Sequence, residues 1–279
     1  MNLLSVGVGP FSIQVSHLQA LAALLVAGGI GHLMGRRQHM GIGHVLSIMV
    51  WVGLLAARVG FVATWWDLYR EDLPSIANLR DGGFTLWPGL AAAGLVAIWH
   101  GWRGAALRRP LMAGVTAGAI TWAALSGWLD NPNRPTLPTV VLTTRAGESL
   151  DLATIANGQP LVVNLWASWC PPCRREMPVL AAAQQREPGV IFVFANQAED
   201  AGTALRYLST HAFQLAHVVF DPRAELGRAV GSTGLPTTLF YDASGQLVST
   251  HLGELSPASL ASQLMQLRAA AKPASQAHP

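Results

Sequence analysis

Four long apolar segments fill most of the first 129 of the 279 residues, and they constrain the fold of this half strongly. A helix needs about 20 apolar residues to cross the hydrocarbon core of a bilayer. We therefore expect four transmembrane helices, at residues 17–35, 41–64, 84–102 and 110–129. Only 12% of the residues are charged, which is well below the share of about 25% in soluble domains and agrees with this interpretation.

The arginines between these segments predict how the helices are oriented. Five arginines fall in residues 36–40 and 103–109, whereas residues 65–83 hold two arginines and four acids. Loops rich in arginine stay in the cytoplasm, so both ends of the chain are expected outside it. In a bacterial inner membrane this orientation places the C-terminal half in the periplasm. The first apolar run lacks a preceding basic segment and is not expected to be a cleaved signal peptide.

Arg58 is the one charged residue inside the second apolar segment. Ionisable side chains are costly in the hydrocarbon core and often mark a site. We therefore consider Arg58 a candidate for contact with a lipid headgroup or another helix. Alternatively, its long side chain extends toward the bilayer surface.

Two pairs of glycines are spaced for close contact between helices. They are Gly31-x-x-x-Gly35 and Gly114-x-x-x-Gly118. Such pairs let two helix backbones approach closely in a membrane. The alternative is that these are simply small residues in apolar helices.

Three short stretches follow one another in the region 8–102: Gly9-Pro10-Phe11-Ser12-Ile13, Ala57-Arg58-Val59-Gly60 and Asp81-Gly82-Gly83-Phe84-Thr85. In order and spacing they resemble prolipoprotein diacylglyceryl transferases. The resemblance is incomplete, because Trp87 stands where that family has a histidine. It implies a repurposed membrane domain that retains contact with lipid through Arg58, rather than a working transferase.

The second half has the charge content of a soluble domain, with 10 basic and 11 acidic residues in 130–279. Residues 130–138 form a Pro-rich linker. Apolar runs at 161–167 and 190–196 are typical of buried strands. Further strands are expected at 140–143, 149–152, 217–220, 237–241 and 246–251, with helices at 172–186, 199–210 and 257–267. The alternation predicts an α/β domain at 139–270 behind an α-helical membrane domain at 1–129, with a disordered tail at 271–279.

The only two cysteines of the chain lie in Trp169-Cys170-Pro171-Pro172-Cys173. A zinc site needs about four ligands, and neither a second cysteine pair nor histidines at ligand spacing are present, so no metal is expected. A purely structural disulfide is the other alternative, but so short a loop constrains little chain entropy. The spacing favours a redox-active dithiol.

The predicted secondary structure gives the two cysteines different roles. The motif follows a strand and opens a helix, so Cys170 lies near the helix N-terminus, where free N–H groups stabilise a thiolate. We expect Cys170 to attack a substrate disulfide and the more buried Cys173 to resolve the mixed disulfide. Pro171 and Pro172 remove two N–H donors near Cys170, which favours the disulfide and makes the reduced protein more reducing.

The stretches Val162–Pro178 and Thr233–Thr238 resemble the thioredoxin superfamily, in particular its TlpA/ResA/DsbE-like branch. This resemblance covers 139–270. It implies a cis Pro236 beside the dithiol and a Leu235 backbone that pairs with the substrate. Trp169, next to Cys170, is expected to shield the site and to contact the substrate. Glu176 matches an acid of the reductase branch that manages protons; alternatively it is a solvent-exposed glutamate. Asn164 stands where cytosolic thioredoxins have a buried aspartate.

Together these features predict a membrane-anchored periplasmic thiol–disulfide oxidoreductase that acts on the thiols and disulfides of proteins. Reduction is the favoured direction, with cytochrome c maturation as one setting. The alternatives are a disulfide oxidase or isomerase, a redox-sensitive assembly factor, and a lipid-transfer enzyme of the membrane half. No cofactor is expected. Because residues 1–169 contain no cysteine, a separate membrane redox partner is expected to supply electrons. The chain lacks a basic run, so no nucleic acid is expected.

Overall fold

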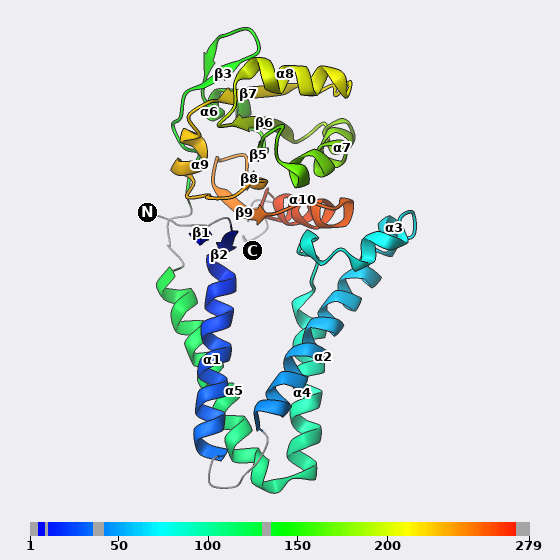
Figure 1. Ribbon diagram of the computed structural model, residues 1–279, viewed down its shortest axis with the longest axis vertical. Coiled ribbons are helices and arrows are strands. Elements are labelled where there is room, and N and C mark those ends of the chain that lie inside the picture. Colours follow the sequence, from blue (N-terminus) through cyan, green and yellow to red (C-terminus); the bar gives the residue numbers. More distant parts are fainter. Residues whose placement is uncertain (1–4, 9–10, 36–41, 130–134, 272–279) are drawn as a thin grey trace, which may run out of the picture. The chain divides into compact units, whose positions relative to one another are not determined.

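A computed structural model describes residues 5–8, 11–35, 42–129 and 135–271 (Figure 1). The chain divides into two compact units. The helical unit comprises residues 15–79 and 83–131, and the α/β unit comprises residues 1–14, 80–82 and 132–279.

The helical unit is built from four long helices, which pack mainly as two pairs. They are α1 (Val15–Gly35), α2 (Ile42–Thr64), α4 (Leu86–Arg103) and α5 (Ala105–Leu129). Helix α1 runs along α5, and α2 runs along α4 (Figure 1). Between α2 and α4 the chain forms the short helix α3 (Trp66–Tyr69) and the 3-10 turns η2 (Leu73–Ala77) and η3 (Leu79–Asp81).

Two segments of this unit are long and apolar enough to cross a membrane. They are Leu18–Gly35 in α1 and Gly43–Thr64 in α2. Helices α4 and α5 are also long, but their glycines, tryptophans and arginines lower their hydropathy. The four-helix membrane domain therefore stays a prediction.

The predicted loop at 103–109 is wrong. Helix α4 ends at Arg103 and α5 already begins at Ala105, because Ala105–Leu107 are good helix formers. Arg108 is thus helical, and its Nε donates to the carbonyl of Gly101 over 2.8 Å. Pro110 lies inside α5 near its start.

Glycines make the close contacts within the helix pairs. A Cβ atom added to Gly114 would lie 2.7 Å from the carbonyl oxygen of Ala27, and one added to Gly118 would lie 3.0 Å from the Ala27 Cβ. In the other pair, a Cβ added to Gly89 would lie 2.9 Å from the Gly53 oxygen. The prediction of close helix contact at Gly114 and Gly118 is confirmed.

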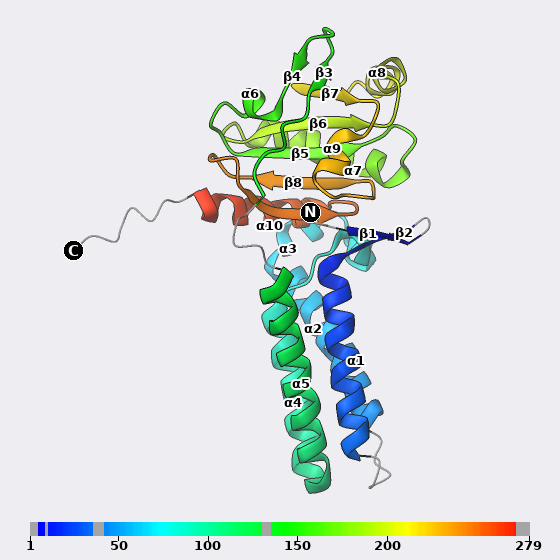
Figure 2. The same ribbon diagram turned by 90° about the vertical axis from the view of Figure 1, so that its left-hand side faces the viewer.

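The α/β unit contains a seven-stranded sheet with the strand order β4-β3-β7-β6-β5-β8-β9 (Figure 2). The strands are β3 (Leu142–Thr144), β4 (Ser149–Leu150), β5 (Leu161–Trp166), β6 (Ile191–Gln197), β7 (His217–Asp221), β8 (Thr237–Tyr241) and β9 (Leu247–Leu252). The central strands β5, β6 and β7 are parallel, whereas β8 is antiparallel to β5 and β9 to β8. The predicted α/β domain is confirmed.

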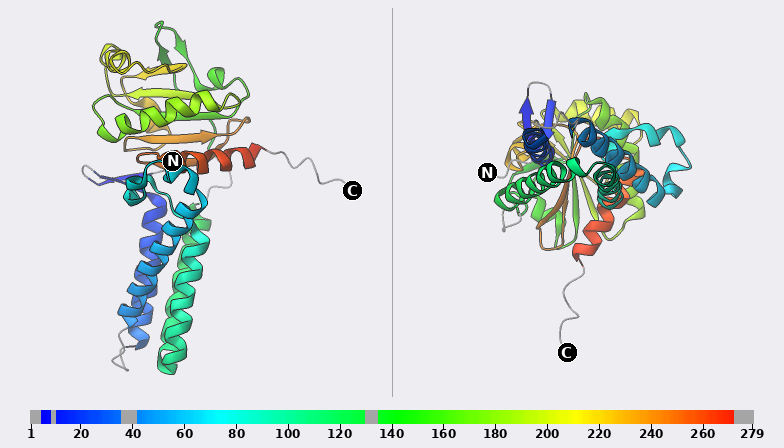
Figure 3. Two further views of the ribbon diagram at one scale, coloured as in Figure 1. Left: turned by 90° about the vertical axis from the view of Figure 1, so that its right-hand side faces the viewer. Right: turned by 90° about the horizontal axis from the view of Figure 1, so that it is seen from below.

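Helices cover both faces of this sheet. The helices are α6 (Leu152–Ala156), α7 (Pro171–Arg186), α8 (Ala201–Thr210), α9 (Glu225–Ala229) and α10 (Pro257–Ala271). Residues of α7, α8 and α10 share one core with the sheet, and residues of α6 and α9 share the other. Figure 3 shows the lime-green α7 lying across its face of the sheet. Along β5 the side chains alternate, so that Val162 and Trp166 lie on the α7 face and Leu161, Val163 and Leu165 on the opposite face.

Several elements of the chain were not predicted. Helices α6 and α9 have five residues each, which is too few to show a helical period. The strands β1 (Ser5–Val8) and β2 (Phe11–Gln14) form an antiparallel pair before α1. Helix α10 continues to Ala271, beyond the predicted end at 267. The rest of the predicted tail, and residues 130–134 of the predicted linker, lie outside the described residues.

Candidate active site

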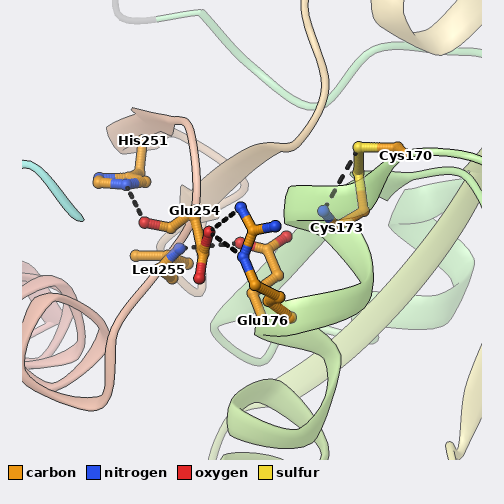
Figure 4. A network of polar contacts seen from close by, with 7 residues as sticks. Cys170, Cys173, Glu176, His251, Glu254 and Leu255 are labelled. Carbon is orange, nitrogen blue, oxygen red and sulfur yellow. Dashed lines mark hydrogen bonds and ion pairs between the residues drawn. A yellow bond between two sulfur atoms is a disulfide. The ribbon is translucent and has the colours of Figure 1, made fainter. Parts of the chain in front are cut away.

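The two cysteines form a disulfide at the start of α7 (Figure 4). Strand β5 ends at Trp166, and four residues later Cys170 occupies the N-cap position of α7. Cys173 lies one turn into the helix. The exposed fraction of Cys170 is 3%, and Cys173 is fully buried. Cys170 is therefore the more exposed of the two cysteines, as expected, although both side chains are buried.

The N–H groups around Cys170 are limited by two prolines. The side chain of an N-cap residue accepts from the N–H of the second or third helical residue. Pro172 occupies the second position and has no N–H. The third position supplies the contact, because the Cys173 N–H donates to Cys170 Sγ over 3.3 Å. Only one of the two capping donors is therefore available at Cys170.

Glu176 lies one turn beyond Cys173 on α7 and is fully buried (Figure 4). One carboxyl oxygen, Oε1, accepts from Asn164 Nδ2 over 2.7 Å, and Oε2 accepts from the Leu255 N–H over 2.9 Å. Burial raises the pKa of Glu176 to about 8, although these two hydrogen bonds favour the charged form. The alternative of a solvent-exposed glutamate is wrong, because Asn164 of β5 and Leu255, in the segment after β9, contact the buried carboxyl group.

The cis-proline segment lies at the end of strand β5 from which the loop to Cys170 starts. The Leu235–Pro236 peptide bond is cis, as the thioredoxin resemblance implies. Strand β8 starts directly afterwards, and Thr237 is paired with Leu165 near the end of β5. Pro236 and the loop leading to Cys170 therefore belong to the same end of these two strands. Trp169 is 62% exposed, so its ring is available to a partner molecule.

Sequence reasoning missed Glu199, whose carboxylate anchors the loop before Cys170. The Ser168 N–H donates to Glu199 Oε2 over 3.0 Å, and the Ser168 hydroxyl donates to Oε1. Asn196 Nδ2 also donates to Oε2, over 2.8 Å. Ala198, just before the carboxylate, has a positive φ of 53°, which is uncommon for a residue with a side chain. An acid two residues after a strand end carries no sequence signal for such a contact.

Arg58 belongs to the helical unit, and its guanidinium is bound by backbone carbonyls. Nη1 donates to the Gly83 oxygen over 2.9 Å, and Nη2 donates to those of Ile76 and Asn78 over 3.0 and 3.1 Å. The side chain is buried, and its carbon Cζ lies 5.4 Å from the centre of the Tyr69 ring. The guanidinium therefore reaches the segment between α2 and α4, and both interpretations of Arg58 stay predictions.

Comparisons with known proteins match the α/β half. The family model described as Redoxin matches residues 132–264. The thiol:disulfide interchange protein DsbE homolog of Paracoccus denitrificans is 34% identical in an alignment of 161 residues, which covers 52% of this chain and 86% of that protein. The thiol-disulfide oxidoreductase ResA of Halalkalibacterium halodurans is 31% identical over 40% of this chain and 64% of its own.

Other matches cover a similar part of the chain. The thiol:disulfide interchange protein DsbE of Escherichia coli is 32% identical over 40% of this chain and 59% of its own length. A crystal structure of a putative thiol:disulfide interchange protein DsbE from Chlorobium tepidum covers 50% of this chain and 97% of its own, with 28% identity and a TM-score of 0.44. From the match to the Paracoccus protein in particular, this chain belongs to the family of DsbE-like thiol:disulfide interchange proteins and is a thiol–disulfide oxidoreductase.

Proposed function

We propose that this protein is a membrane-anchored reductase of protein disulfides, with its exchange domain at residues 139–270 on the periplasmic side of a bacterial inner membrane. The observation that carries the proposal is a disulfide at a helix N-terminus with a fully buried carboxyl group one turn below it. This arrangement offers both a nucleophile and a group that can take up a proton.

The reaction is two successive thiol–disulfide exchanges. The Cys170 thiolate attacks one sulfur of the substrate disulfide, forms a mixed disulfide and releases the other substrate sulfur as a thiolate, which takes a proton from water. Cys173 then loses its proton and attacks the Cys170 sulfur. The Cys170–Cys173 disulfide forms, and the second substrate sulfur leaves. Two electrons pass from the protein to the substrate.

Glu176 is the group proposed to take the proton of Cys173. The two residues are three positions apart and therefore lie on the same side of α7. Because Cys173 is fully buried, water alone would remove its proton slowly. A carboxyl group with a pKa of about 8 is partly charged near neutral pH and able to accept a proton from a thiol, whose ordinary pKa is about 8.5. When exchange runs in the opposite direction, Glu176 would return this proton to Cys173.

Reduction is favoured over oxidation by the capping geometry of α7. A strongly oxidising dithiol needs a stabilised thiolate, since this stabilises the reduced form. At Cys170 the second helical position is a proline, and the Cys173 N–H is left as the capping donor. This weak stabilisation favours the disulfide form of the protein and hence reduction of the substrate. Cytochrome c maturation, in which apoprotein cysteines must be kept reduced, is a fitting setting.

The substrate-binding surface is proposed to surround the disulfide. An extended substrate segment would pair with the backbone of Leu235 beside Pro236, while the exposed ring of Trp169 would pack on its side chains. The partners are thus protein segments containing cysteines, together with a separate membrane protein that returns electrons to Cys170 and Cys173.

Trapping of a mixed disulfide tests the proposal. In the full-length protein, Cys173→Ala should stop the reaction after the first exchange and accumulate complexes that a reductant releases. Cys170→Ser is the matched control and should form none. Multiple turnover by Cys173→Ala at the wild-type rate would contradict the assignment of the resolving cysteine. A measured equilibrium with glutathione that leaves the protein mainly reduced in an oxidising buffer would instead favour the oxidase alternative.

A further inference from the structure

The amide of Asn164 connects Glu176 to the strand that follows the cis-proline. Asn164 lies in β5 opposite Thr238 of β8, and its side chain points to the face covered by α7. Its Nδ2 donates to Glu176 Oε1 over 2.7 Å and to Thr238 Oγ1 over 3.0 Å. Its Oδ1 is buried and has no hydrogen-bond partner among the described residues.

This arrangement suits only one protonation state of Glu176. A charged carboxylate accepts hydrogen bonds and has none to donate, and it is here met by two N–H donors, Asn164 Nδ2 and the Leu255 N–H. A neutral carboxyl group must place its own O–H against an acceptor. Of the two partners of this carboxyl group among the described residues, the Leu255 N–H cannot accept, and the amide of Asn164 is the one that also carries an acceptor oxygen.

A half-turn of the amide about χ2 provides that acceptor. Oδ1 then takes the place of Nδ2 and accepts from the Glu176 O–H. Thr238 suits both orientations, because a hydroxyl group can either accept or donate. In each orientation one amide atom is hydrogen-bonded to Glu176. The other amide atom then lies where Oδ1 lies in the structure, a position without a hydrogen-bond partner among the described residues. The two orientations are therefore close in the number of bonds formed, and the proton on Glu176 decides between them.

We propose that Asn164 is a positioning residue whose side-chain amide reverses its orientation whenever Glu176 gains or loses its proton. The inference rests on the proposed role of Glu176 as acceptor of the Cys173 proton. When Cys173 is deprotonated, the proton moves to Glu176, and the amide reverses to hold the new O–H. When Glu176 later releases the proton to solvent, the amide returns. The hydroxyl group of Thr238, two residues after Pro236, changes from acceptor to donor when Glu176 gains the proton and back to acceptor when Glu176 loses it.

Among the residues that the structure describes, the charged groups around Glu176 are engaged elsewhere and do not compete for this proton. On α7, Arg175 is engaged by Glu254 over 2.6 Å. Glu254 lies beside the Leu255 N–H and repels negative charge at Glu176. On β9, the His251 ring contacts the Glu254 carbonyl, and burial lowers the pKa of this histidine. The acidic proton therefore has Asn164 as its partner on the β5 side, and Cys173 lies one turn away on the same helix.

The orientation of the amide can be followed by NMR in the full-length oxidised protein in detergent micelles, labelled with 15N at asparagine side chains. Between about pH 5 and about pH 10, the Asn164 NH2 signals should shift with a single midpoint. That midpoint should equal the one at which the infrared C=O band of the Glu176 carboxylic acid disappears. Glu176→Gln should remove both transitions. Asn164 signals that stay constant while the Glu176 band titrates would overturn the inference.

Substitutions separate the amide from the rest of the pocket. Asn164→Leu removes a charge-assisted hydrogen bond, so Glu176 should bind its proton about tenfold more tightly. Thr238→Val is the matched control, because it removes a neutral partner in both orientations and should leave the midpoint nearly unchanged. Equal shifts in the two variants would contradict the proposal. None of these measurements depends on turnover, whereas a Glu176→Gln variant that resolves mixed disulfides at the wild-type rate would contradict only the proposed catalytic role.

Discussion

Glu176 makes the stability of the α/β unit depend on pH. Its pKa is raised by burial from an ordinary value of 4.5 to about 8 in the folded protein. Between these two values the folded protein holds a proton that the unfolded chain has released. The free energy of unfolding therefore decreases as the pH rises through this window, by at most about 1.4 kcal/mol per pH unit.

Replacement of the carboxyl group should remove this dependence. We expect Glu176→Gln to unfold at a higher temperature than the wild type above about pH 8, and the difference to shrink toward about pH 5. Thermal unfolding of the oxidised proteins, followed by tryptophan fluorescence across the pH range, measures it. If the difference in unfolding temperature between the two proteins were the same at every pH, Glu176 would not hold a proton in the folded state over this range.

The roles of single residues were only partly predictable from the sequence. The cysteine spacing identified the dithiol, because that signal is local. The burial of Glu176 was not decidable, since its partner Leu255 is 79 residues away in the chain. Glu199 was missed for the same reason, because the Ser168 group it binds is 31 residues away. Contacts between side chains distant in the chain leave no periodic pattern.

At the level of elements, the first turn of α7 sets the redox properties of the dithiol. Pro172→Ala would restore the N–H at the second helical position, which can donate to the N-cap sulfur of Cys170. The thiolate, and with it the reduced protein, becomes more stable. We expect a reduction potential that is higher by roughly 10–30 mV, measured by equilibration with glutathione.

Pro178 offers a control in the same helix. It lies inside α7, two turns beyond Cys170. Pro178→Ala restores a backbone hydrogen bond away from the helix N-terminus and should leave the reduction potential unchanged. A shift of equal size in both variants would mean that general helix stability, and not the capping donor, controls the dithiol.

The glycines of α5 determine how closely it packs on α1. A Cβ at Gly114 would meet the Ala27 oxygen at 2.7 Å, so Gly114→Ala forces the helices apart and should destabilise the protein by about 1–3 kcal/mol. Gly127 lies in the same helix with nothing within 4 Å of an added Cβ. Gly127→Ala is therefore expected to be neutral or stabilising. Thermal stability in detergent compares the two, and equal losses would contradict the packing contact.

Elements marked by a clear apolar run or a turn signal were predicted well, and elements without such a signal were not. The strand β8 has the predicted bounds, because a buried apolar run and a turn signal mark it. Helix α5 begins at Ala105, before the predicted residue 110, because arginine is a good helix former and the arginines at 103–109 do not interrupt it. Charge indicates the end of an apolar segment and does not by itself end a helix.

For the whole molecule, the distribution of arginines predicts the side of the membrane on which the dithiol works. We expect Cys170 to react with a membrane-impermeant thiol reagent in intact cells with a permeable outer membrane, after mild reduction. Cys170 and Cys173 are the only two cysteines of the sequence, so any labelling reports on this motif alone. Cys170→Ser with Cys173→Ser supplies the unlabelled background. Labelling only after rupture of the inner membrane would reverse the proposed orientation.

The absence of cysteines from residues 1–169 of the sequence predicts that the helical unit does not carry electrons across a membrane. In liposomes that contain this protein with its α/β unit outside, thioredoxin, its reductase and NADPH sealed inside should leave the external disulfide oxidised. Addition of a reductant outside the liposomes is the positive control. Reduction of Cys170–Cys173 from inside, without leakage, would contradict the need for a separate membrane partner.

The complete burial of Cys173 and Glu176 has an electrochemical consequence. Two electrons delivered into a site from which water is excluded would create negative charge next to a carboxyl group, and such charge is costly in a medium of low polarity. Each electron must therefore be accompanied by a proton. Below the pKa values of the thiols, the midpoint potential should fall by about 60 mV per pH unit, as for a two-electron, two-proton couple. The domain then carries hydrogen equivalents rather than bare electrons, and its driving force is linked to the acidity of the compartment in which it works.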